Sequence, residues 1–542
     1  MNYKQLWLCC ILLLCALLSC KEDKETRPAP APIEPALPTP TSTAADKELL
    51  DKVQQSTFRY FWDYAHPASG MARERTGSGD VVTSGGTGFG VQAIVVAVHR
   101  GWITRQEAVE RLNKLVDFLA KADRFHGAWS HWLNGNTGRA IPFSAKDNGG
   151  DLVETSFLIN GLLTAREYFS GAGAAEVALR QKITELWETV EWDWYASRGD
   201  NQLYWHWSPT SGWEMNMPIR GWNEALITYI PALSSPTHPI SPDVYQNSWV
   251  QPGFGDARNY SGYTLKLGPG YGGPLFFAHY SFLGLDPRRM QDSYTNYWLQ
   301  NLNHTLINRG YSLLSAPATY GYSEGFWGLT ASDDPDGYAA HHPGNDNGTV
   351  APTAALSSFP YTPYYSMQAL RYFYNSLGAK LIGEYGLKDA HNKARNWTAT
   401  DHLAIDQGPI VAMIENYRSG LLWDLFTDLP EIQAGLAKAN IREPEYEEGF
   451  PLAVSDIRTE WVDLLKHPDL EAYRVAVATD NAASYTLSLL KKDGTLAEDI
   501  WKDEAQTIGL HQVNFGAEAV PGEYTLRLTN QSTSKELKVF LH

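Results

Sequence analysis

The chain has 542 residues, of which 43% are hydrophobic and 19% charged, and its formal net charge is −17. This is the composition of a globular protein, and the length favours two domains over one core. The negative charge argues against a nucleic-acid partner, because phosphate binding needs a basic surface. It also disfavours an anionic polysaccharide, so a neutral ligand fits best. The 19 Trp and 29 Tyr can line a sugar-binding cleft or simply fill a large core.

The first 20 residues, MNYKQLWLCCILLLCALLSC, have one positive charge, an apolar run and then small residues before a cysteine, as a signal peptide does. The ending LLSC resembles the lipoprotein box of bacteria, in which cleavage leaves the cysteine as the lipidated first residue. We therefore expect a signal peptide over 1–19 and lipidation at Cys20. All four cysteines lie in this segment, so the rest of the chain has no disulfide and no thiolate metal site.

Residues 20–45 are expected to form an extended tether, because RPAPAPIEPALPTPTSTA is rich in Pro, Ala and Thr. The predicted location is that of an outer-membrane lipoprotein of a Gram-negative bacterium, facing the periplasm or the cell surface. Only the lipid on Cys20 would contact the membrane, and we expect a monomer.

From residue 46 to 445 the spacing of apolar residues is mainly helical, with Thr104 as the predicted N-cap of one helix. About a dozen helices, separated by loops rich in glycine and aromatic residues, indicate an α/α toroid, in which inner helices surround a cleft. The clearest helical stretches are 46–65, 104–122, 151–169, 174–190, 223–233 and 363–381.

After residue 445 the apolar residues alternate with a period near two, as in AYRVAVATD, SYTLSLLKK and GEYTLRLTN. Residues 446–542 are therefore predicted to form a small β-sandwich. It could bind carbohydrate or serve only as a packing module, since its strands show no row of exposed tryptophans.

Acidic residues stand among glycines and aromatics in four stretches. KDNGGDLVETSF carries Asp147, Asp151 and Glu154, and the last two share a helix face. RGWNEALITY carries Glu224. Asp151 and Glu224 could each be an ordinary acid in the first turn of a helix, where acids are favoured. That explanation accounts less well for Glu154, which interrupts the apolar run LVETSFLI.

The third stretch, YSEGFWGLTASDDPDGY, places Glu324 and Trp327 in a loop. The fourth, LAIDQGPIVAMIENYRSGLLW, places Asp406 just before a helix that we expect to begin at the proline. Glu415 and Arg418 are three residues apart on that helix and are expected to pair with each other.

Hydrolysis of a glycosidic bond needs two carboxyl groups, one to protonate the leaving oxygen and one to activate water or attack carbon. The chain has enough acids for this chemistry and lacks a GxSxG elbow, an HExxH motif and a P-loop. The glycine run 85–90 does not follow a predicted strand, so we give it no nucleotide role. No cofactor and no metal are expected.

Five long blocks resemble a known family. They are GTGFGVQAIVVAVHRGWITRQEA, GWNEALITYIPALSSPTHP, EGFWGLTASDDPDGY, GTVAPTAALSSFPYTP and AIDQGPIVAMIENYRSGLLW. Their sequence and order resemble the glucoamylase-like family of glycoside hydrolases, which includes bacterial β-1,2-glucanases. The resemblance covers most of residues 50–430.

The resemblance implies an (α/α)6 toroid and hydrolysis of β-1,2-glucan with inversion, giving β-1,2-glucooligosaccharides that include sophorose. It places catalytic roles on Glu224, Asp151, Glu154 and Asp406, with Glu224 as the expected proton donor. The base remains open between Asp406 and Asp151. The residues expected to bind substrate are Asp147, Trp222, His279, Tyr280, Glu324 and Trp327.

Two other functions remain open. The enzyme could act from a chain end and release sophorose, and the loop 248–273 would decide this if it blocks one end of the cleft. Alternatively, the protein could be a surface glycan-binding lipoprotein without catalysis, although such a protein need not keep four acids together. A polysaccharide lyase is disfavoured, because it would need cationic groups to neutralise a uronate.

We expect Cys20→Ala to release the protein from the membrane without loss of specific activity, because the lipid would be its only anchor. Membrane fractionation followed by an activity assay of the soluble fraction measures this. A variant that still sediments with the membranes would contradict the predicted anchor.

Overall fold

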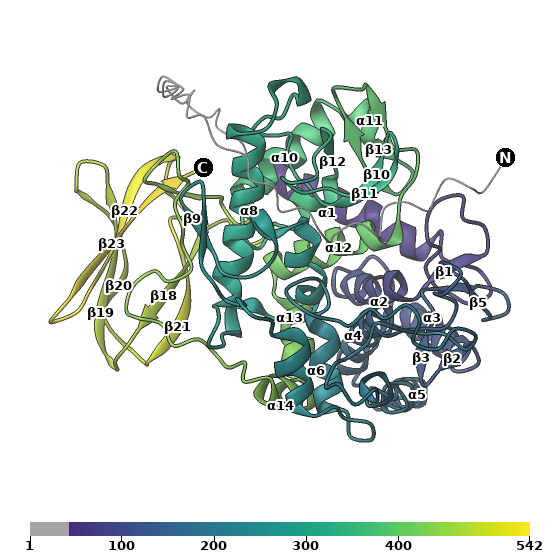
Figure 1. The fold of residues 1–542 in the computed structure, drawn as a ribbon. Coiled ribbons are helices and arrows are strands. Elements are labelled where there is room, and N and C mark those ends of the chain that lie inside the picture. Colours follow the sequence, from purple (N-terminus) through teal and green to yellow (C-terminus); the bar gives the residue numbers. More distant parts are fainter. Residues whose placement is uncertain (1–42) are drawn as a thin grey trace, which may run out of the picture. The chain divides into compact units, whose positions relative to one another are not determined.

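The computed structural model describes residues 43–542, so the predicted signal peptide, Cys20 and nearly all of the tether lie outside the described residues. The described chain is mainly helical up to residue 438 and consists of β-strands from residue 462 onwards (Figure 1). No helix in 43–542 has the length and apolar composition of a membrane span.

The helices are α1 (Thr43–Trp62), α2 (Ser84–His99), α3 (Arg105–Leu119), α4 (Leu152–Tyr168), α5 (Ala174–Glu188), α6 (Leu226–Ser234), α7 (Pro242–Val244), α8 (Tyr297–Leu314), α9 (Pro352–Leu356), α10 (Pro363–Asn375), α11 (Gly378–Leu381), α12 (Ala404–Arg418), α13 (Leu421–Thr427) and α14 (Pro430–Lys438). The expected N-cap of α3 is confirmed: the Thr104 hydroxyl accepts the N–H of Glu107, whose carboxylate accepts the N–H of Thr104 in return.

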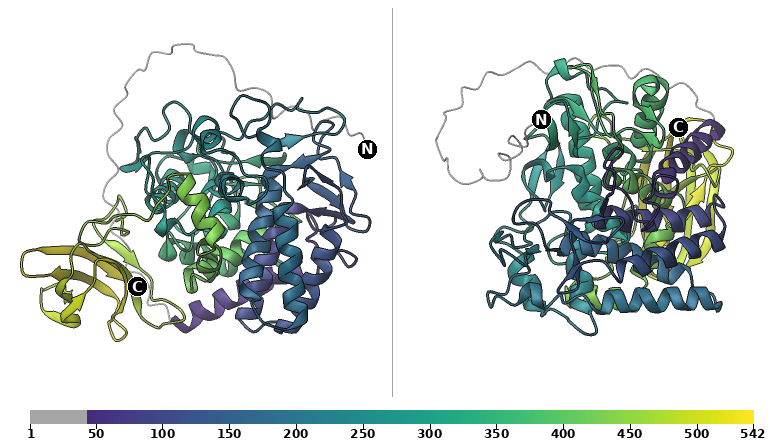
Figure 2. Two further views of the ribbon diagram at one scale, coloured as in Figure 1. Left: turned by 90° about the horizontal axis from the view of Figure 1, so that it is seen from below. Right: turned by 90° about the vertical axis from the view of Figure 1, so that its right-hand side faces the viewer.

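Burial divides these helices into two kinds. Nearly every side chain of α2, α4 and α12 is buried, whereas α3 and α5 bury only one face. The buried helices contact one another: α2 packs against α4 and α12, α4 against α6, and α12 against α1 and α9 (Figures 1 and 2).

Short strands connect the helices and shape the loops between them. They are β1 (Val81–Thr83), β2 (Arg124–Phe125), β3 (Ala128–Trp129), β4 (Trp132–Asn134), β5 (Ala140–Ile141), β6 (Gly150–Asp151), β7 (His206–Trp207), β8 (Arg258–Tyr260), β9 (Tyr263–Leu265), β10 (Ala331–Asp334), β11 (Gly337–Ala340), β12 (Thr349–Val350), β13 (Ile382–Gly383), β14 (Gly386–Leu387), β15 (His391–Asn392) and β16 (Trp397–Thr398).

The C-terminal strands form two sheets. A five-stranded sheet has the order β17-β23-β22-β19-β20, with β17 parallel to β23 and the other pairs antiparallel, and β18 pairs with β21. Apolar side chains of both sheets form one hydrophobic cluster. The bounds are β17 (Val462–Leu464), β18 (Tyr473–Thr479), β19 (Ala483–Lys491), β20 (Leu496–Gln506), β21 (Gly509–Phe515), β22 (Gly522–Thr529) and β23 (Ser534–Leu541).

Two sequence interpretations need correction. The glycine run 85–90 does follow a strand, β1, and it opens helix α2. Helix α12 begins at Ala404 rather than at Pro409, so Asp406 lies in the first helical turn and the proline lies inside the helix. Pro409 is the sixth residue of the helix, so its missing N–H removes a single intrahelical hydrogen bond, the one to the carbonyl of Ile405.

The glycines of α2 allow an unusually close helix pair. A Cβ on Gly161 of α4 would lie 2.1 Å from the carbonyl oxygen of Gly88, and a Cβ on Gly88 would lie 2.1 Å from that of Phe157. Because the obstacles are backbone atoms, they cannot rotate away as a side chain could. The glycine run therefore serves the packing of α2 against α4.

Gly161→Ala should lower the free energy of unfolding by at least about 1–3 kcal/mol, the usual range for overpacking a core. Gly310→Ala is the matched control, since Gly310 lies within α8 and a Cβ there meets nothing within 4 Å. It should be neutral or raise stability by up to about 1 kcal/mol, because alanine is the better helix former. Urea unfolding of both variants measures this, and equal stability of the two would contradict the packing argument.

Candidate active site

Asp151 lies at the centre of the first acidic group, which consists of Asp147, Asp151, Glu154, His131 and His206. Its Oδ1 accepts the N–H groups of Val153 (3.1 Å) and Glu154 (2.9 Å), so Asp151 is the N-cap of α4. Its Oδ2 lies 3.3 Å from His131 Nδ1 and 3.3 Å from His206 Nε2. The pairing of β6 with β7 sets Asp151 directly opposite His206. Every oxygen of this carboxylate is therefore engaged.

Asp147 and Glu154 complete this group. Asp147 Oδ2 lies 3.3 Å from His206 Nε2, so the two aspartates hold one imidazole between them. Glu154 Oε2 accepts the N–H of Gly85 (2.7 Å) and the hydroxyl of Thr83 at the start of α2, and its Oε1 lies 3.9 Å from His131. A positive helix end thus faces the Glu154 carboxyl.

Both histidines of this group are cationic at neutral pH. Burial lowers the pKa of His131, but the charges of Glu154 and Asp151 outweigh it and raise the pKa to about 9. Burial likewise opposes a rise at His206, where Asp151 and Asp147 bring the pKa to about 10. In return, the two imidazolium groups outweigh burial and hold the pKa of Asp151 well below its usual range.

These protonation states bear on metal binding. His131, Asp147 and Asp151 offer ligand atoms that lie within 4.8 Å of one another. The raised pKa of His131 favours an ion-pair network, in which an imidazolium pairs with the carboxylates, and a metal bound here would have to displace the proton of His131. Such a network can hydrogen-bond the hydroxyl groups of a sugar.

Glu224 lies in the turn before α6 and is half-buried. The Ser281 hydroxyl donates to its backbone carbonyl, which fixes the turn. Burial, followed by the charges of Glu154 and Asp151, raises the pKa of Glu224 to about 7. A glutamic acid with this pKa is about half protonated at pH 7 and mostly protonated at lower pH, so it can serve as a proton donor.

Asp406 belongs to a second acidic group. It is 1% exposed in the first turn of α12, and Asp389, 2% exposed, lies in the loop before β15. The N–H of Asp333 donates to Asp389 Oδ2 (2.6 Å), and Arg75 binds the Asp333 carboxylate with its Nη1 at 3.0 and 3.1 Å. Burial and the charge of Asp389 raise the pKa of Asp406 well above its usual range.

Two tyrosines interact electrostatically with the acids. Burial, then the charge of Asp406 and further that of Glu224, raise the pKa of Tyr280, so this phenol interacts with an acid of each group. Tyr338 on β11 is 51% exposed and lies directly opposite Asp333 of β10 in the pairing of these strands. Tyr338 is therefore an accessible aromatic ring beside the second group.

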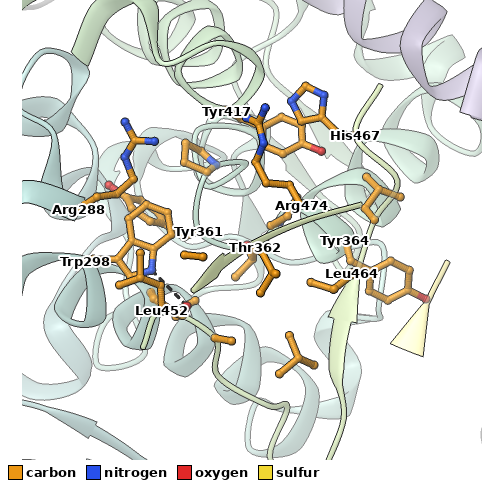
Figure 3. Close-up of a pocket in the computed structure, with 18 of the residues that line it drawn as sticks. Arg288, Trp298, Tyr361, Thr362, Tyr364, Tyr417, Leu452, Leu464, His467 and Arg474 are labelled. Carbon is orange, nitrogen blue, oxygen red and sulfur yellow. Dashed lines mark hydrogen bonds between the residues drawn. The ribbon is translucent and has the colours of Figure 1, made fainter. Parts of the chain in front are cut away.

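A second accessible ring stands beside the first group. Phe143 is 50% exposed and stacks on His131 with ring centroids 4.4 Å apart. Exposed aromatic faces next to carboxyl groups suit the apolar face of a sugar ring. A cavity of about 220 Å³, bordered by Trp298, Tyr361 and Arg474, contains none of the predicted site residues (Figure 3).

Comparison with known proteins gives the family. Residues 216–430 match the family model Glycoamylase, described as "Putative glucoamylase". An endo-β-1,2-glucanase from Chitinophaga pinensis, solved with sophorotriose and glucose, is 53% identical; the match covers 74% of this chain and 99% of that chain, with a TM-score of 0.72. The chain belongs to this glucoamylase-like family.

Two further relatives of the glucoamylase-like chain are informative. An exo β-1,2-glucooligosaccharide sophorohydrolase (non-reducing end) from Parabacteroides distasonis is 47% identical over 421 residues, or 73% of this chain and 58% of the relative. The chain thus spans less than two thirds of the length of that relative. A structure of the endo-β-1,2-glucanase from Talaromyces funiculosus, 12% identical with a TM-score of 0.54 over 74% of this chain and 92% of that chain, shows a likeness of fold alone.

Four other residues that we expected to bind substrate mainly contact other side chains of the protein. His279 is 2% exposed and hydrogen-bonds Ser358, and Trp327 is fully buried. Trp222, 5% exposed, packs against other aromatic rings, and Glu324 forms ion pairs with Arg309 and Arg458. Among the described residues no side-chain hydrogen bond or ion pair joins these four to Asp151, Glu154, Glu224 or Asp406, and their sugar contacts stay predictions.

The expected pair between Glu415 and Arg418 is wrong. The Glu415 carboxylate accepts two hydrogen bonds from Arg100, at 2.7 and 2.8 Å, while Arg418 binds Asp469 (2.7 Å) and Asp51 (2.6 Å). Both side chains are almost fully buried at the end of α12, where these partners from distant segments lie nearer than the helical neighbour. Because Glu415 forms these buried ion pairs, a substitution of Glu415 cannot serve as a neutral control for substitutions of the active-site acids.

Sequence reasoning missed several residues of the site. His131 and His206 stand next to tryptophans in SHW and WHW, which was the available signal. For Asp389 in LKDAHN nothing nearby marked an active-site acid. The remaining missed residues are Arg75, Asp333 and Tyr338.

Proposed function

We propose that the protein is a glycoside hydrolase that acts on β-1,2-glucans and releases sophorose from chain ends. The observation that carries the chemistry is Glu224, a carboxyl group whose pKa of about 7 suits a proton donor. The substrate is supported by the two relatives that are 47% and 53% identical, both named for β-1,2-linked glucose polymers or oligosaccharides.

In the proposed reaction Glu224 protonates the oxygen that leaves the anomeric carbon, while a second carboxylate takes a proton from the attacking water. Attack from the opposite face inverts the anomeric configuration. Asp406 is the better candidate for this base, but burial and the charge of Asp389 raise its pKa, so it must lose its own proton before it can accept one from water. Both oxygens of Asp151 are engaged by helix N–H groups and imidazolium groups, whereas no described residue donates a hydrogen bond from N–H or O–H to Asp406 in its ionised state.

Asp147, Asp151 and Glu154 then have a different task. Together with His131 and His206 they form the charged network described above, which places imidazolium N–H groups and carboxylates beside Glu224. We assign them the binding of sugar hydroxyls and the raising of the Glu224 pKa.

Release from a chain end is the first candidate because the Parabacteroides distasonis relative carries that activity. A hollow of about 410 Å³ adjoins Gly221 and Trp222, next to Glu224, and is bordered by the loop 251–258 and by residues 266–269. In the proposed function this loop segment restricts one side of the substrate. Cleavage within the chain is the second candidate, favoured by the Chitinophaga pinensis relative.

We also propose the architecture and location expected from the sequence. The alternation of fully buried with half-buried helices supports an (α/α)6 toroid over 46–445, followed by a β-sandwich over 446–542. The lipid anchor on Cys20 and a position on the outer membrane belong to this proposal.

Glu224→Gln should lower kcat by at least about 10²-fold, the lower end for general acid catalysis, with little effect on KM. In the wild type the rate should fall as pH rises through about 7, since the donor loses its proton there. That basic limb should be absent from the residual activity of the variant. Steady-state kinetics on linear β-1,2-glucan over a range of pH measures both effects.

Glu110→Gln is the control, because Glu110 is an exposed residue of α3 that undergoes the same chemical change. It should leave kcat and the pH profile unchanged. Near-normal turnover by Glu224→Gln would show that Glu224 is an ordinary acid before a helix. The donor would then have to be another carboxyl group.

A time course of products separates the two candidate modes. The mature protein is incubated with linear β-1,2-glucan, and its products are resolved from the first minutes onwards. Sophorose alone at the earliest times is expected and supports release from chain ends. A ladder of oligosaccharides would establish cleavage within the chain, and unchanged glucan would contradict the proposed function.

A further inference from the structure

The loop 268–273, GPGYGG, holds a tyrosine in a strained backbone conformation. Tyr271 has a φ of 58° and a ψ of 11°, in the left-handed region that favours glycine, and its side chain is 38% exposed. A bulky residue is rarely found there, and such strain persists only where the surrounding structure enforces it. The chain thus accepts a conformational cost at the position where this loop presents an aromatic ring to solvent.

The packing of the loop against α8 enforces this conformation. A Cβ on Gly272 would lie 2.3 Å from the ring of His304 on α8, so the backbone of the loop approaches the helix as closely as a glycine allows. The N–H of Gly272 also donates to the carbonyl of Pro269 (2.9 Å), which closes the turn around Tyr271. The ring of Tyr271 is therefore held in place before any ligand arrives, and a ligand that binds it loses little free energy to ordering.

A second tyrosine lies against this ring. Tyr260, half-buried at the end of β8, has its ring centroid 4.5 Å from that of Tyr271, with the ring planes inclined by 34°. Tyr311 of α8 lies 6.1 Å from Tyr271, and its hydroxyl donates to Asp346 (3.1 Å). The hydroxyls of Tyr260 and Tyr271 have no hydrogen-bond partner among residues 43–542. These two residues, which we call the tyrosine platform, thus combine aromatic faces with hydroxyl groups that can bind a ligand.

The tyrosine platform is connected to the hollow of about 410 Å³ beside the proposed proton donor. Arg258 borders this hollow and lies two residues before Tyr260, hence on the same face of β8. Its Nη2 donates to the carbonyl of Gly268, which fixes β8 to the loop that carries the other tyrosine. A Cβ on Gly268 would in turn lie 3.0 Å from Cδ1 of Trp222, two residues before Glu224. One wall of the hollow therefore belongs to the Glu224 segment and another to the strand of the platform.

We propose that Tyr260 and Tyr271 bind a glucose unit of the β-1,2-glucan chain at the far side of this hollow, which rests on the proposed function. The C–H face of a glucose ring packs on an aromatic face, and its hydroxyl edge reaches the polar tip of a tyrosine. The ligand is neutral, in keeping with the net charge of −17. The tyrosine platform touches no reacting atom. It holds a distant part of the chain and so favours long substrates over short ones.

The test compares KM and kcat for a long linear β-1,2-glucan and for a β-1,2-linked trisaccharide. Tyr271→Ala removes the ring and should raise KM for the long glucan about three- to tenfold, the range expected for loss of one aromatic contact. Its kcat should stay unchanged, and KM for the trisaccharide should change less, because most of a short chain is bound beside Glu224. Tyr260→Ala should act in the same direction. Tyr271→Trp keeps an aromatic face and should retain the wild-type KM.

Ile508→Ala is the control, because Ile508 is an apolar side chain that is 68% exposed between β20 and β21, in the C-terminal sheets. It should leave KM and kcat unchanged, and circular dichroism checks that each variant is folded. If the wild type cleaves the long glucan but neither tyrosine-to-alanine variant raises KM, the tyrosine platform is overturned and the proposed function stands. An equal rise of KM for both substrates, or a fall in kcat alone, would also overturn it.

A binding measurement does not depend on cleavage. Affinity electrophoresis in gels that contain linear β-1,2-glucan should slow the migration of Glu224→Gln, and Tyr271→Ala in that background should reduce this retardation. If the glucan is bound through Tyr271 but the wild type does not cleave it, the tyrosine platform stands and the proposed function fails. If the glucan is neither bound nor cleaved, both proposals fail.

Discussion

The structure depends on keeping several carboxyl groups together in a buried region with few cations. Water cannot stabilise these charges, so each group must gain an imidazolium, a helix N-terminus or a proton. The protein uses all three: His131 and His206 serve Asp151, the start of α2 serves Glu154, and burial raises the pKa values of Asp389 and Asp406 so that they favour the protonated form. Different partners give these acids different protonation states, and acid–base catalysis needs that difference.

The helix packing that permits this is local. Because no side chain separates α2 from α4 at Gly88 and Gly161, the N–H of Gly85 can reach the Glu154 carboxylate at 2.7 Å. A Cβ on Gly85 would itself lie 2.5 Å from that carboxylate. The same glycine run thus sets the distance between two helices and provides a donor to the acidic group.

Much of this could be predicted from the sequence, for identifiable reasons. Local signals such as the capping box of Thr104, the apolar spacing of the helices and the alternation in the last hundred residues predicted the elements that the structure contains. The acids Asp147, Asp151, Glu154, Glu224 and Asp406 stood out because each lies among glycines or aromatics. Partners that only the fold brings together could not be found this way. Asp389 is separated from Asp406 by the antiparallel strand pair β15–β16. Glu415 pairs with Arg100, more than 300 residues away in the sequence, and not with its helical neighbour Arg418.

Helix α12 has a consequence for how the chain folds during synthesis. Its side chains contact the beginning of the helical region, through Gln54 and Asp51 of α1, and Asp469, which follows β17. These contacts span almost the whole described chain, so they impose a large loop-closure cost and a high contact order. The ribosome synthesises α1 long before α12 and Asp469. Until then, Gln54 and Asp51 of α1 lack their partners on α12. The helix that carries Asp406 therefore completes its packing only at the end of translation, when exposed apolar surface makes the nascent chain most dependent on protection from aggregation.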